Sequence, residues 1–243
     1  MTIINSSSNK QVQLLKKLAQ KKYRAQFALF LAEGSRLVCD AIRLGANVVQ
    51  VYQSQTAFEK QPFENAVVLA DKIFDSISDT VNTQGVIATI KIEQKPFSKG
   101  NCLILDGVAD PGNVGTLLRT ASATGFLDVF LCNCADVYSS KVVRSAMSAH
   151  FLLNLHVVDL ENAFSMVKGM DVYCADMGGQ DVFDVKFEQP FALVLGNEAN
   201  GVSQFSKDNS TKIVFLPMEN QLVSLNVSVA GGVLMYLSKN IRR

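Results

Sequence analysis

Five short, almost continuously apolar runs in the second half of the chain restrict most strongly what it can fold into. They cover residues 102–105, 129–132, 172–175, 191–195 and 212–216. Strands of a parallel sheet are apolar throughout because both of their faces are buried, whereas a strand with one face in water alternates. Helical patterns lie between the runs, notably over residues 114–123 and 141–149. This alternation of apolar runs and helical patterns predicts an α/β domain with helices on both faces of its sheet.

The first half of the chain predicts a smaller α/β unit. Ser8 or Asn9 can cap a helix that continues to about Tyr23, and further helices are expected over residues 35–44 and 72–78. Strand patterns occupy residues 27–32, 47–53, 67–70 and 85–92. Residues 93–101 (EQKPFSKGN) combine Pro, Gly, Ser and charge, as linkers do. We therefore predict two domains, residues 1–95 and 101–243.

The charges are balanced overall but unevenly distributed. The 243 residues contain 23 Lys and Arg against 22 Asp and Glu, a net charge of +1. Residues 1–32 hold no acid and carry the cations Lys10, Lys16, Lys17, Lys21, Lys22 and Arg24. Such a basic stretch is a candidate for contact with nucleic-acid phosphates, and a solvated helix face is the alternative.

The sequence lacks the residue patterns that several functional classes require. The five cysteines are odd in number and spread out, which favours free thiols over a disulfide framework. Cys132 and Cys134 have no histidine nearer than His150, so we predict no metal site. No apolar run reaches the 18 or so residues of a membrane helix. Residues 1–10 are polar and unlike a secretory signal, so we expect a cytoplasmic protein without membrane contact.

Three segments that follow predicted strands carry the polar residues of interest. Ligands of open α/β sheets bind beyond the carboxyl ends of the strands, so such positions are candidates for a site. The segments are DGVADPGNVGTLLRTA (residues 106–121), LGNEANGVS (195–203) and LPMENQLVSLNVSVAGGVLM (216–235). None contains the glycine pattern of a dinucleotide-binding fold or of a P-loop.

Together and in this order, the segments resemble the three motifs of the SpoU/TrmH ribose 2′-O-methyltransferases. The matching residues are Asn113, Gly115, Arg119 and Ala121, then 195–198 with Gly201, then 216–218 with 224–227. Residues 138–144 also resemble the stretch after the second strand of that family. The amino-terminal unit is similar to the ribosomal-protein-like substrate-binding domain of the family, through Lys16, Lys17, residues 30–34 and residues 84–85.

The resemblance implies a trefoil-knotted methyltransferase domain of the SPOUT superfamily, which uses S-adenosylmethionine. By family position, the cofactor lies among the loops that carry Gly196, Asn197, Leu216 and Leu225. The implied reaction is 2′-O-methylation of a ribose in structured RNA. We expect ribosomal RNA as the substrate, and transfer RNA is the nearest alternative substrate. The alternative from another functional class is a non-catalytic RNA-binding assembly factor of the same fold.

The resemblance also implies the catalytic set, which consists of Asn113, Arg119, Glu198, Ser224 and Asn226. In the family the arginine is proposed as the base. Because an arginine side chain stays protonated in proteins, stabilising the developing 2′-oxyanion is the other possible role. Asn113 and Glu198 would orient Arg119 or the ribose, and Ser224 and Asn226 would hold the third loop by hydrogen bonds.

RNA contacts and self-association complete the expectations. The predicted RNA-binding residues are Lys16, Lys17, Lys21, Lys22, Arg24, Lys141 and Arg144. The helix predicted over residues 226–237 is apolar on more than one face, beyond what a surface helix needs. Since this region contributes to a dimer interface in the family, we predict a homodimer; a helix fully buried within one subunit is the alternative.

Overall fold

The computed structural model describes residues 2–219 and 224–239 and contains two compact units. Unit 1 comprises Met1–Glu93 and Tyr138–Phe151, and unit 2 comprises Gln94–Val137 and Leu152–Arg243. Residues 138–151 are predicted to be part of the carboxyl-terminal domain. In the structure they group with unit 1, because Val143 and Phe151 join its apolar core.

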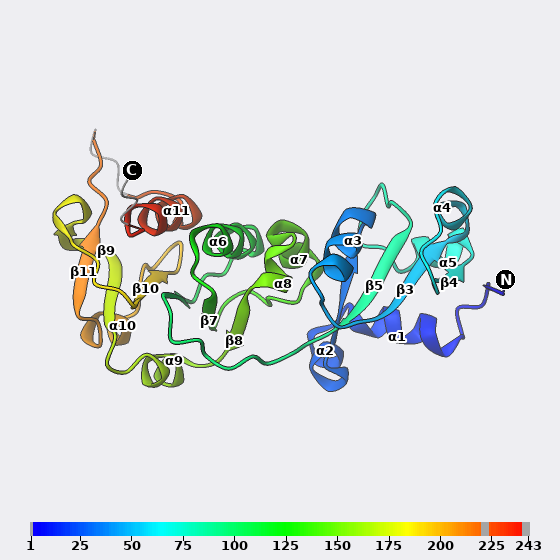
Figure 1. The fold of residues 1–243 in the computed structure, drawn as a ribbon, viewed down its shortest axis with the longest axis horizontal. Helices are drawn as coiled ribbons and strands as arrows, with labels where there is room; N and C mark the ends of the chain where they lie inside the picture. The colour runs from blue at the N-terminus through cyan, green and yellow to red at the C-terminus, as the bar shows by residue number, and fades with distance from the viewer. Residues whose placement is uncertain (1, 220–223, 240–243) are drawn as a thin grey trace. The chain divides into compact units, whose positions relative to one another are not determined.

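Unit 1 is built on a mixed sheet with the strand order β1-β4-β3-β5-β2 (Figure 1). The strands are β1 (Ile3–Ile4), β2 (Leu29–Glu33), β3 (Val48–Ser54), β4 (Val67–Leu69) and β5 (Val86–Lys91). β5 runs antiparallel to β2 and β3, whereas β4 is parallel to β1 and β3. The four longer strands lie within two residues of the predicted ones. β1 is not predicted, because two residues carry no periodicity.

Helices cover both faces of this sheet. They are α1 (Lys10–Leu18), α2 (Lys21–Phe27), α3 (Ser35–Arg43), α4 (Gln55–Lys60), α5 (Asp71–Asp75), α7 (Ser140–Ala146) and α8 (Ala149–Leu152). Phe30 and Ala32 of β2 face a core shared with α3 and α7, while Leu31 packs against the core beneath α1 and α5. This alternation is the period-2 pattern of a strand between two layers.

The single helix predicted up to Tyr23 is wrong, since the chain turns between α1 and α2. Asn9 caps α1 as expected, with its side chain accepting from the backbone N–H of Gln11. Gln20 is extended (φ −101°, ψ 134°), and α2 then continues through Phe27, which was predicted to be in a strand. The buried guanidinium of Arg24 donates to the carbonyls of Leu18 (2.7 Å) and Ala19 (2.8 Å), so the broken end of α1 keeps its hydrogen bonds.

Unit 2 contains the predicted parallel sheet, with the strand order β11-β9-β10-β6-β7-β8. The strands are β6 (Cys102–Asp106), β7 (Asp128–Cys132), β8 (Asn154–Val157), β9 (Asp171–Asp181), β10 (Phe191–Gly196) and β11 (Lys212–Phe215). All neighbours pair in parallel, which confirms the predicted architecture. β8 is not predicted. It lies at the edge of the sheet, is only partly buried and has no continuous apolar run.

Helices flank this sheet on both sides, as Figure 1 shows, with α6 (Pro111–Thr124) and α11 (Val227–Leu237) on one side and α9 (Leu160–Met166) and α10 (Gln204–Asp208) on the other. A short 3₁₀ turn follows β9 at Val182–Asp184. α11 packs closely because a Cβ at Gly231 would lie 2.4 Å from Leu195 and 2.6 Å from Leu117. Within the described residues, no helix is long and apolar enough to cross a membrane.

Candidate active site

A cavity of about 510 Å³ lies in unit 2, at the carboxyl ends of β9, β10 and β11 and beside the start of α11. Its walls come from within residues 175–177, 195–201, 214–218 and 224–234. This volume is typical of small-molecule sites. The four residues predicted to bind the cofactor, Gly196, Asn197, Leu216 and Leu225, all line the cavity. The cavity therefore lies at the edge of the sheet to which the rule that ligands sit beyond the strand ends points.

One wall of the cavity is the tight loop after β10. The backbone N–H of Asn197 donates to the carbonyl of Gly201 (2.8 Å), and the N–H of Gly201 donates back (2.9 Å). The Asn197 side chain accepts from the N–H groups of Ala199 and Asn200 and donates to the carbonyl of Gly107 (2.8 Å). A Cβ at Gly196 would lie 2.2 Å from backbone atoms of Gly201 and Val202, so this turn requires glycine.

Three of the predicted catalytic side chains form a hydrogen-bonded chain that crosses all three motifs. The Nδ2 of Asn226 donates to Oδ1 of Asn113 (3.0 Å), whose Nδ2 donates to Oε1 of Glu198 (2.9 Å). Asn226 is also the N-cap of α11, since its Oδ1 accepts from the backbone N–H of Ser228 (2.9 Å). These contacts tie the start of α6, the loop after β10 and the start of α11 into one assembly.

Glu198 is held as a carboxylate. Besides Asn113, it accepts from the backbone N–H groups of Ala109 and Asp110, each at 3.1 Å. Partial burial by itself raises the pKa of the Glu198 carboxyl, but these hydrogen bonds favour the charged form more strongly, so the pKa lies below its ordinary value. At neutral pH Glu198 is therefore an acceptor of hydrogen bonds and no source of a proton.

Two family models match the chain. The SpoU rRNA Methylase family matches residues 100–236, more than half of the chain, and the MRM3-like substrate binding domain matches residues 9–88. The chain belongs to the SpoU rRNA methylase family.

Individual proteins agree with this assignment. This SpoU methylase is 31% identical to the 23S rRNA (guanosine(2553)-2′-O)-methyltransferase RlmP of Bacillus subtilis, over 97% of this chain and 98% of that protein. A putative RNA methyltransferase of the TrmH family from Porphyromonas gingivalis shares its fold with a TM-score of 0.83 and 30% identity, over 95% of this chain and 97% of that one. An AdoMet-bound rRNA methyltransferase from Sinorhizobium meliloti has the same fold, with a TM-score of 0.86 and 25% identity, over 98% of this chain and 97% of that one.

The other two predicted catalytic residues are placed differently. Ser224 lines the cavity but forms no hydrogen bond with another described residue. Arg119 is exposed on α6 and does not line the cavity, and its side chain forms no hydrogen bond or ion pair within residues 2–219 and 224–239. Six helical residues turn the chain by about 240° relative to Asn113, so the two side chains leave α6 on different sides. The structure thus does not bring Asn113 and Glu198 to Arg119 within this chain.

The residues predicted to contact RNA belong to unit 1. Lys16, Lys17, Lys21 and Lys22 lie on α1 and α2, and Lys141 is exposed on α7. Arg144 pairs with Asp79 (3.3 Å), which already offsets part of its charge. Arg24 is only 6% exposed, and this burial contradicts its predicted phosphate contact.

Sequence reasoning missed two acidic residues at this edge of the sheet of the SpoU methylase. Asp106 ends β6 and accepts from the N–H of Ser203 (2.8 Å) and the hydroxyl of Ser206 (2.7 Å), which fixes the start of α10. Asp176 lines the cavity and pairs with Lys207 (2.7 Å). Both follow apolar runs directly, so the strand-end rule itself could have found them. In the part of the chain that the structure describes, no group of three His, Cys, Asp or Glu could hold a metal ion.

Proposed function

We propose that this SpoU methylase transfers a methyl group from S-adenosylmethionine to a ribose 2′-hydroxyl of ribosomal RNA. The observation that carries the proposal is the chain Asn226–Asn113–Glu198, which joins all three motifs beside a cavity of cofactor size. Relatives support the substrate class, since the proteins from Bacillus subtilis and Blochmanniella floridana are named as 23S rRNA guanosine 2′-O-methyltransferases.

Methyl transfer from labelled S-adenosylmethionine to purified ribosomal and transfer RNA tests this proposal. We expect transfer to ribosomal RNA, and none when the target ribose is replaced by 2′-deoxyribose, because that change removes the nucleophile and leaves the base in place. Methylation of the deoxy substrate would place the reaction on a base. RNA binding without any methyl transfer would favour the non-catalytic assembly factor. Methylation of transfer RNA alone would make transfer RNA, and not ribosomal RNA, the substrate.

The cavity suits S-adenosylmethionine in its size and its lining residues. Apolar side chains such as Leu216 and Leu225 can contact the adenine, and the bare backbone at Gly196 allows a close approach. The described lining residues include the carboxylates of Asp176 and Glu198 and no Lys, Arg or His, which suits a ligand with a sulfonium cation. When bound, the cofactor supplies an electrophilic methyl group.

The chain's own residues then position the ribose and manage charge. Glu198 keeps residues 109–113 in place through three hydrogen bonds, and Asn226 holds α11 against Asn113. Ser224, which is exposed at the cavity, is available to bind a ribose hydroxyl. Arg119 is assigned to the negative charge that develops on the 2′-oxygen, because a protonated guanidinium stabilises an oxyanion.

Replacing Gly196 by alanine should disrupt cofactor binding. The new Cβ would overlap backbone atoms of Gly201 and Val202, so the loop must open. We expect a loss of about 1–3 kcal/mol in the free energy of unfolding and at least a roughly tenfold weaker affinity for S-adenosylmethionine, measured by urea unfolding and calorimetry. Gly178→Ala is the control, because its Cβ would meet only Asp176 Oδ1 at 3.8 Å. Unchanged affinity in Gly196→Ala would place the cofactor elsewhere.

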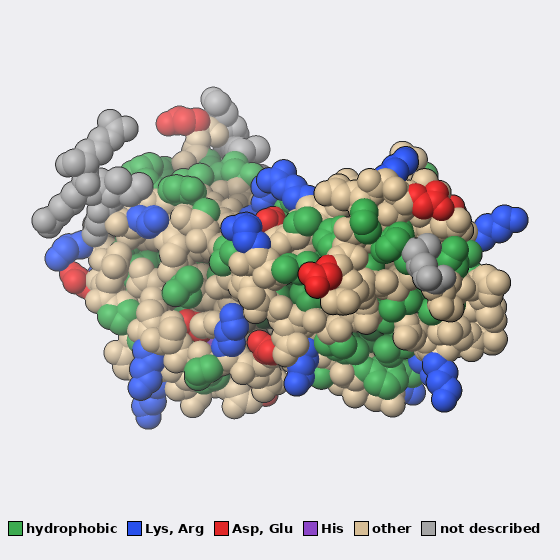
Figure 2. Space-filling model, turned by 45° about the vertical axis from the view of Figure 1, so that its right-hand side comes forward, with side chains coloured by type: hydrophobic (Ala, Val, Ile, Leu, Met, Phe, Trp, Pro, Cys, Tyr) green, Lys and Arg blue, Asp and Glu red, His purple; other side chains and the backbone are tan. Residues whose placement is uncertain are grey.

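The four lysines of α1 and α2 are proposed to contact RNA phosphates. Figure 2 shows Lys and Arg side chains scattered over the drawn face. Each Lys→Gln substitution at positions 16, 17, 21 and 22 should reduce the slope of log affinity against log salt by roughly 0.7–0.9. Lys168→Gln and Lys212→Gln in unit 2 serve as controls. If the salt slope does not change, the lysines of α1 and α2 do not contact RNA phosphates and only form a solvated face.

A homodimer is proposed from the outer face of α11. Gly231, Leu234 and Met235 are buried, whereas Val229, Val233 and Tyr236 form an exposed apolar stripe at helical spacing. Sedimentation at micromolar concentration should give twice the chain mass of 26.5 kDa, and Val233→Asp should shift the protein toward the single chain. A monomer at that concentration would contradict the proposal.

The trefoil knot and the cytoplasmic location are also proposals. The knot follows from the family resemblance, and in the parallel sheet the late strand β10 pairs with β6, the first strand of unit 2.

A further inference from the structure

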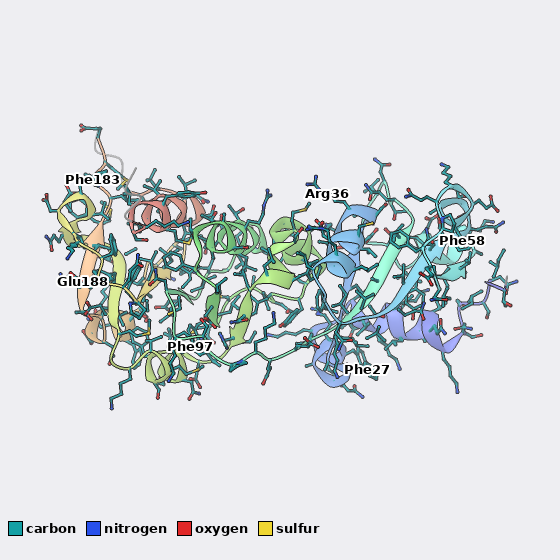
Figure 3. All side chains as sticks on the ribbon, viewed as in Figure 1. Phe27, Arg36, Phe58, Phe97, Phe183 and Glu188 are labelled. Carbon is teal, nitrogen blue, oxygen red and sulfur yellow. The ribbon has the colours of Figure 1, made fainter. Side chains whose placement is uncertain are left out.

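Helices α1 and α2 place two aromatic rings and two amines together on unit 1. The rings of Tyr23 and Phe27, one turn apart on α2, stack with centroids 6.4 Å apart and planes inclined by 20°. The amines of Lys17 and Lys22 lie 5.6 and 5.8 Å from the centroid of the Tyr23 ring. Phe27 is 40% exposed, and Figure 3 shows it on α2 at the lower edge of unit 1 as drawn. We call Lys17, Lys22, Tyr23 and Phe27 the aromatic corner.

The backbone beneath the aromatic corner is held in place. Arg24 bridges from α2 to the last carbonyls of α1, and Leu15 and Leu18 anchor α1 in the interior. Directly after Phe27, Ala28 takes a left-handed conformation (φ 51°) that ends α2, and β2 begins. The backbone at Phe27 is therefore held between a helix end and a strand, so the protein loses little backbone entropy when a ligand contacts this residue.

The chemistry of the aromatic corner fits a nucleotide. A single exposed phenylalanine is ordinary on protein surfaces. Here, however, the exposed ring extends a stack with Tyr23, and two amines that can meet negative charge lie over the Tyr23 ring. Residues 1–32 contain no acid, and the carboxylate of Glu33, the first acid in the chain, is engaged by the hydroxyls of Ser78, Thr80 and Thr83. A planar base with flanking phosphates complements both features.

We propose that Phe27 stacks on an unpaired base of the RNA substrate while Lys17 and Lys22 contact the phosphates beside it. The inference rests on the proposed function, since it takes RNA as the substrate. In a duplex both faces of a base are covered by its neighbours, so the aromatic corner accepts only a bulged, looped or terminal nucleotide. Unit 1 thereby selects structured RNAs that offer an unpaired nucleotide.

Two RNA hairpins of equal length test the inference with the full-length protein. One carries a single bulged 2-aminopurine, and in the other the same nucleotide is paired. The protein should bind the bulged hairpin more tightly and quench its fluorescence. Phe27→Ala should remove the quenching and weaken binding of the bulged hairpin by roughly 5- to 150-fold, with the salt slope and the paired hairpin unaffected. Phe27→Trp should keep both properties.

The matched control is Phe183→Ala. Phe183 is 68% exposed in unit 2 but stands beside Asp181 and Asp184, whose charges repel RNA, so this substitution should change neither hairpin. Thermal unfolding checks that each variant remains folded. If Phe27→Ala binds the bulged hairpin like the unmodified protein, or weakens both hairpins equally, the stacking role is wrong. Active methyl transfer without Phe27-dependent quenching overturns only this inference, whereas quenching without methyl transfer overturns only the proposed function.

Discussion

Replacing Arg119 by alanine should slow methyl transfer by about 10²–10³-fold, the usual cost of removing one electrostatic partner of a transition state. The affinity for S-adenosylmethionine should hardly change, because Arg119 does not line the cavity. Single-turnover methyl transfer to ribosomal RNA measures the first quantity, and calorimetry measures the second. A normal rate in Arg119→Ala would remove this residue from the proposed site.

Arg119→Lys separates two roles of the side chain. Lysine keeps the positive charge but loses the planar group with several N–H donors. A substantial residual rate in the lysine variant, and not in the alanine variant, would indicate that charge near the 2′-oxygen is what matters. Equal loss in both variants would indicate a requirement for the geometry of the guanidinium. Lys168→Ala, at an exposed cation of unit 2, should leave the rate unchanged and serves as the control.

Asp128→Ala should lower the free energy of unfolding by ~3–5 kcal/mol, as the loss of one member of a buried polar pair usually does. The Asp128 side chain is fully buried at the start of β7. Its carboxylate lies 2.8 Å from Nε2 of His156, accepts from Nδ2 of Asn154 (3.1 Å), and is also bound by the hydroxyl of Ser98. Alanine would leave all three groups without this partner. The cavity lies at the opposite ends of the strands, so folded Asp128→Ala should still bind cofactor.

The same carboxylate predicts how stability responds to acid. Burial by itself raises the pKa of Asp128, but the hydrogen bonds from His156, Ser98 and Asn154 outweigh it, and the pKa lies below its ordinary value. The stabilisation is therefore complete above the pKa in the unfolded chain, about 3.9, and is lost as the pH falls through the lower pKa of the folded protein. In urea unfolding, the stability difference from Asp128→Asn should shrink below about pH 4.

Much of the fold could be predicted because its signals are local. A fully buried parallel strand leaves a continuous apolar run, as in β6 and β10, and a cap residue such as Asn9 marks where a helix starts. The signal fails where burial is partial, as in the edge strand β8, or where a side chain remakes the hydrogen bonds of a broken helix, as Arg24 does between α1 and α2. Phe27 reads as the start of a strand because its aromatic ring suits either structure.

By itself, the sequence determined the parallel α/β architecture of unit 2, because periodicity is encoded by neighbouring residues. The family resemblance predicted Gly196, Leu216 and Leu225 as cofactor-binding residues, and all three line the cavity. Only the tertiary structure decided that Asn226, Asn113 and Glu198 form one hydrogen-bonded chain, that Arg119 stands apart from the cavity, and that Arg24 is buried. Asn113 meets partners 85 and 113 residues away in the chain, and no local pattern specifies contacts at such separations. They arise from the packing of α6 against α11 and from the order of the strands, which brings distant loops to one edge of the sheet.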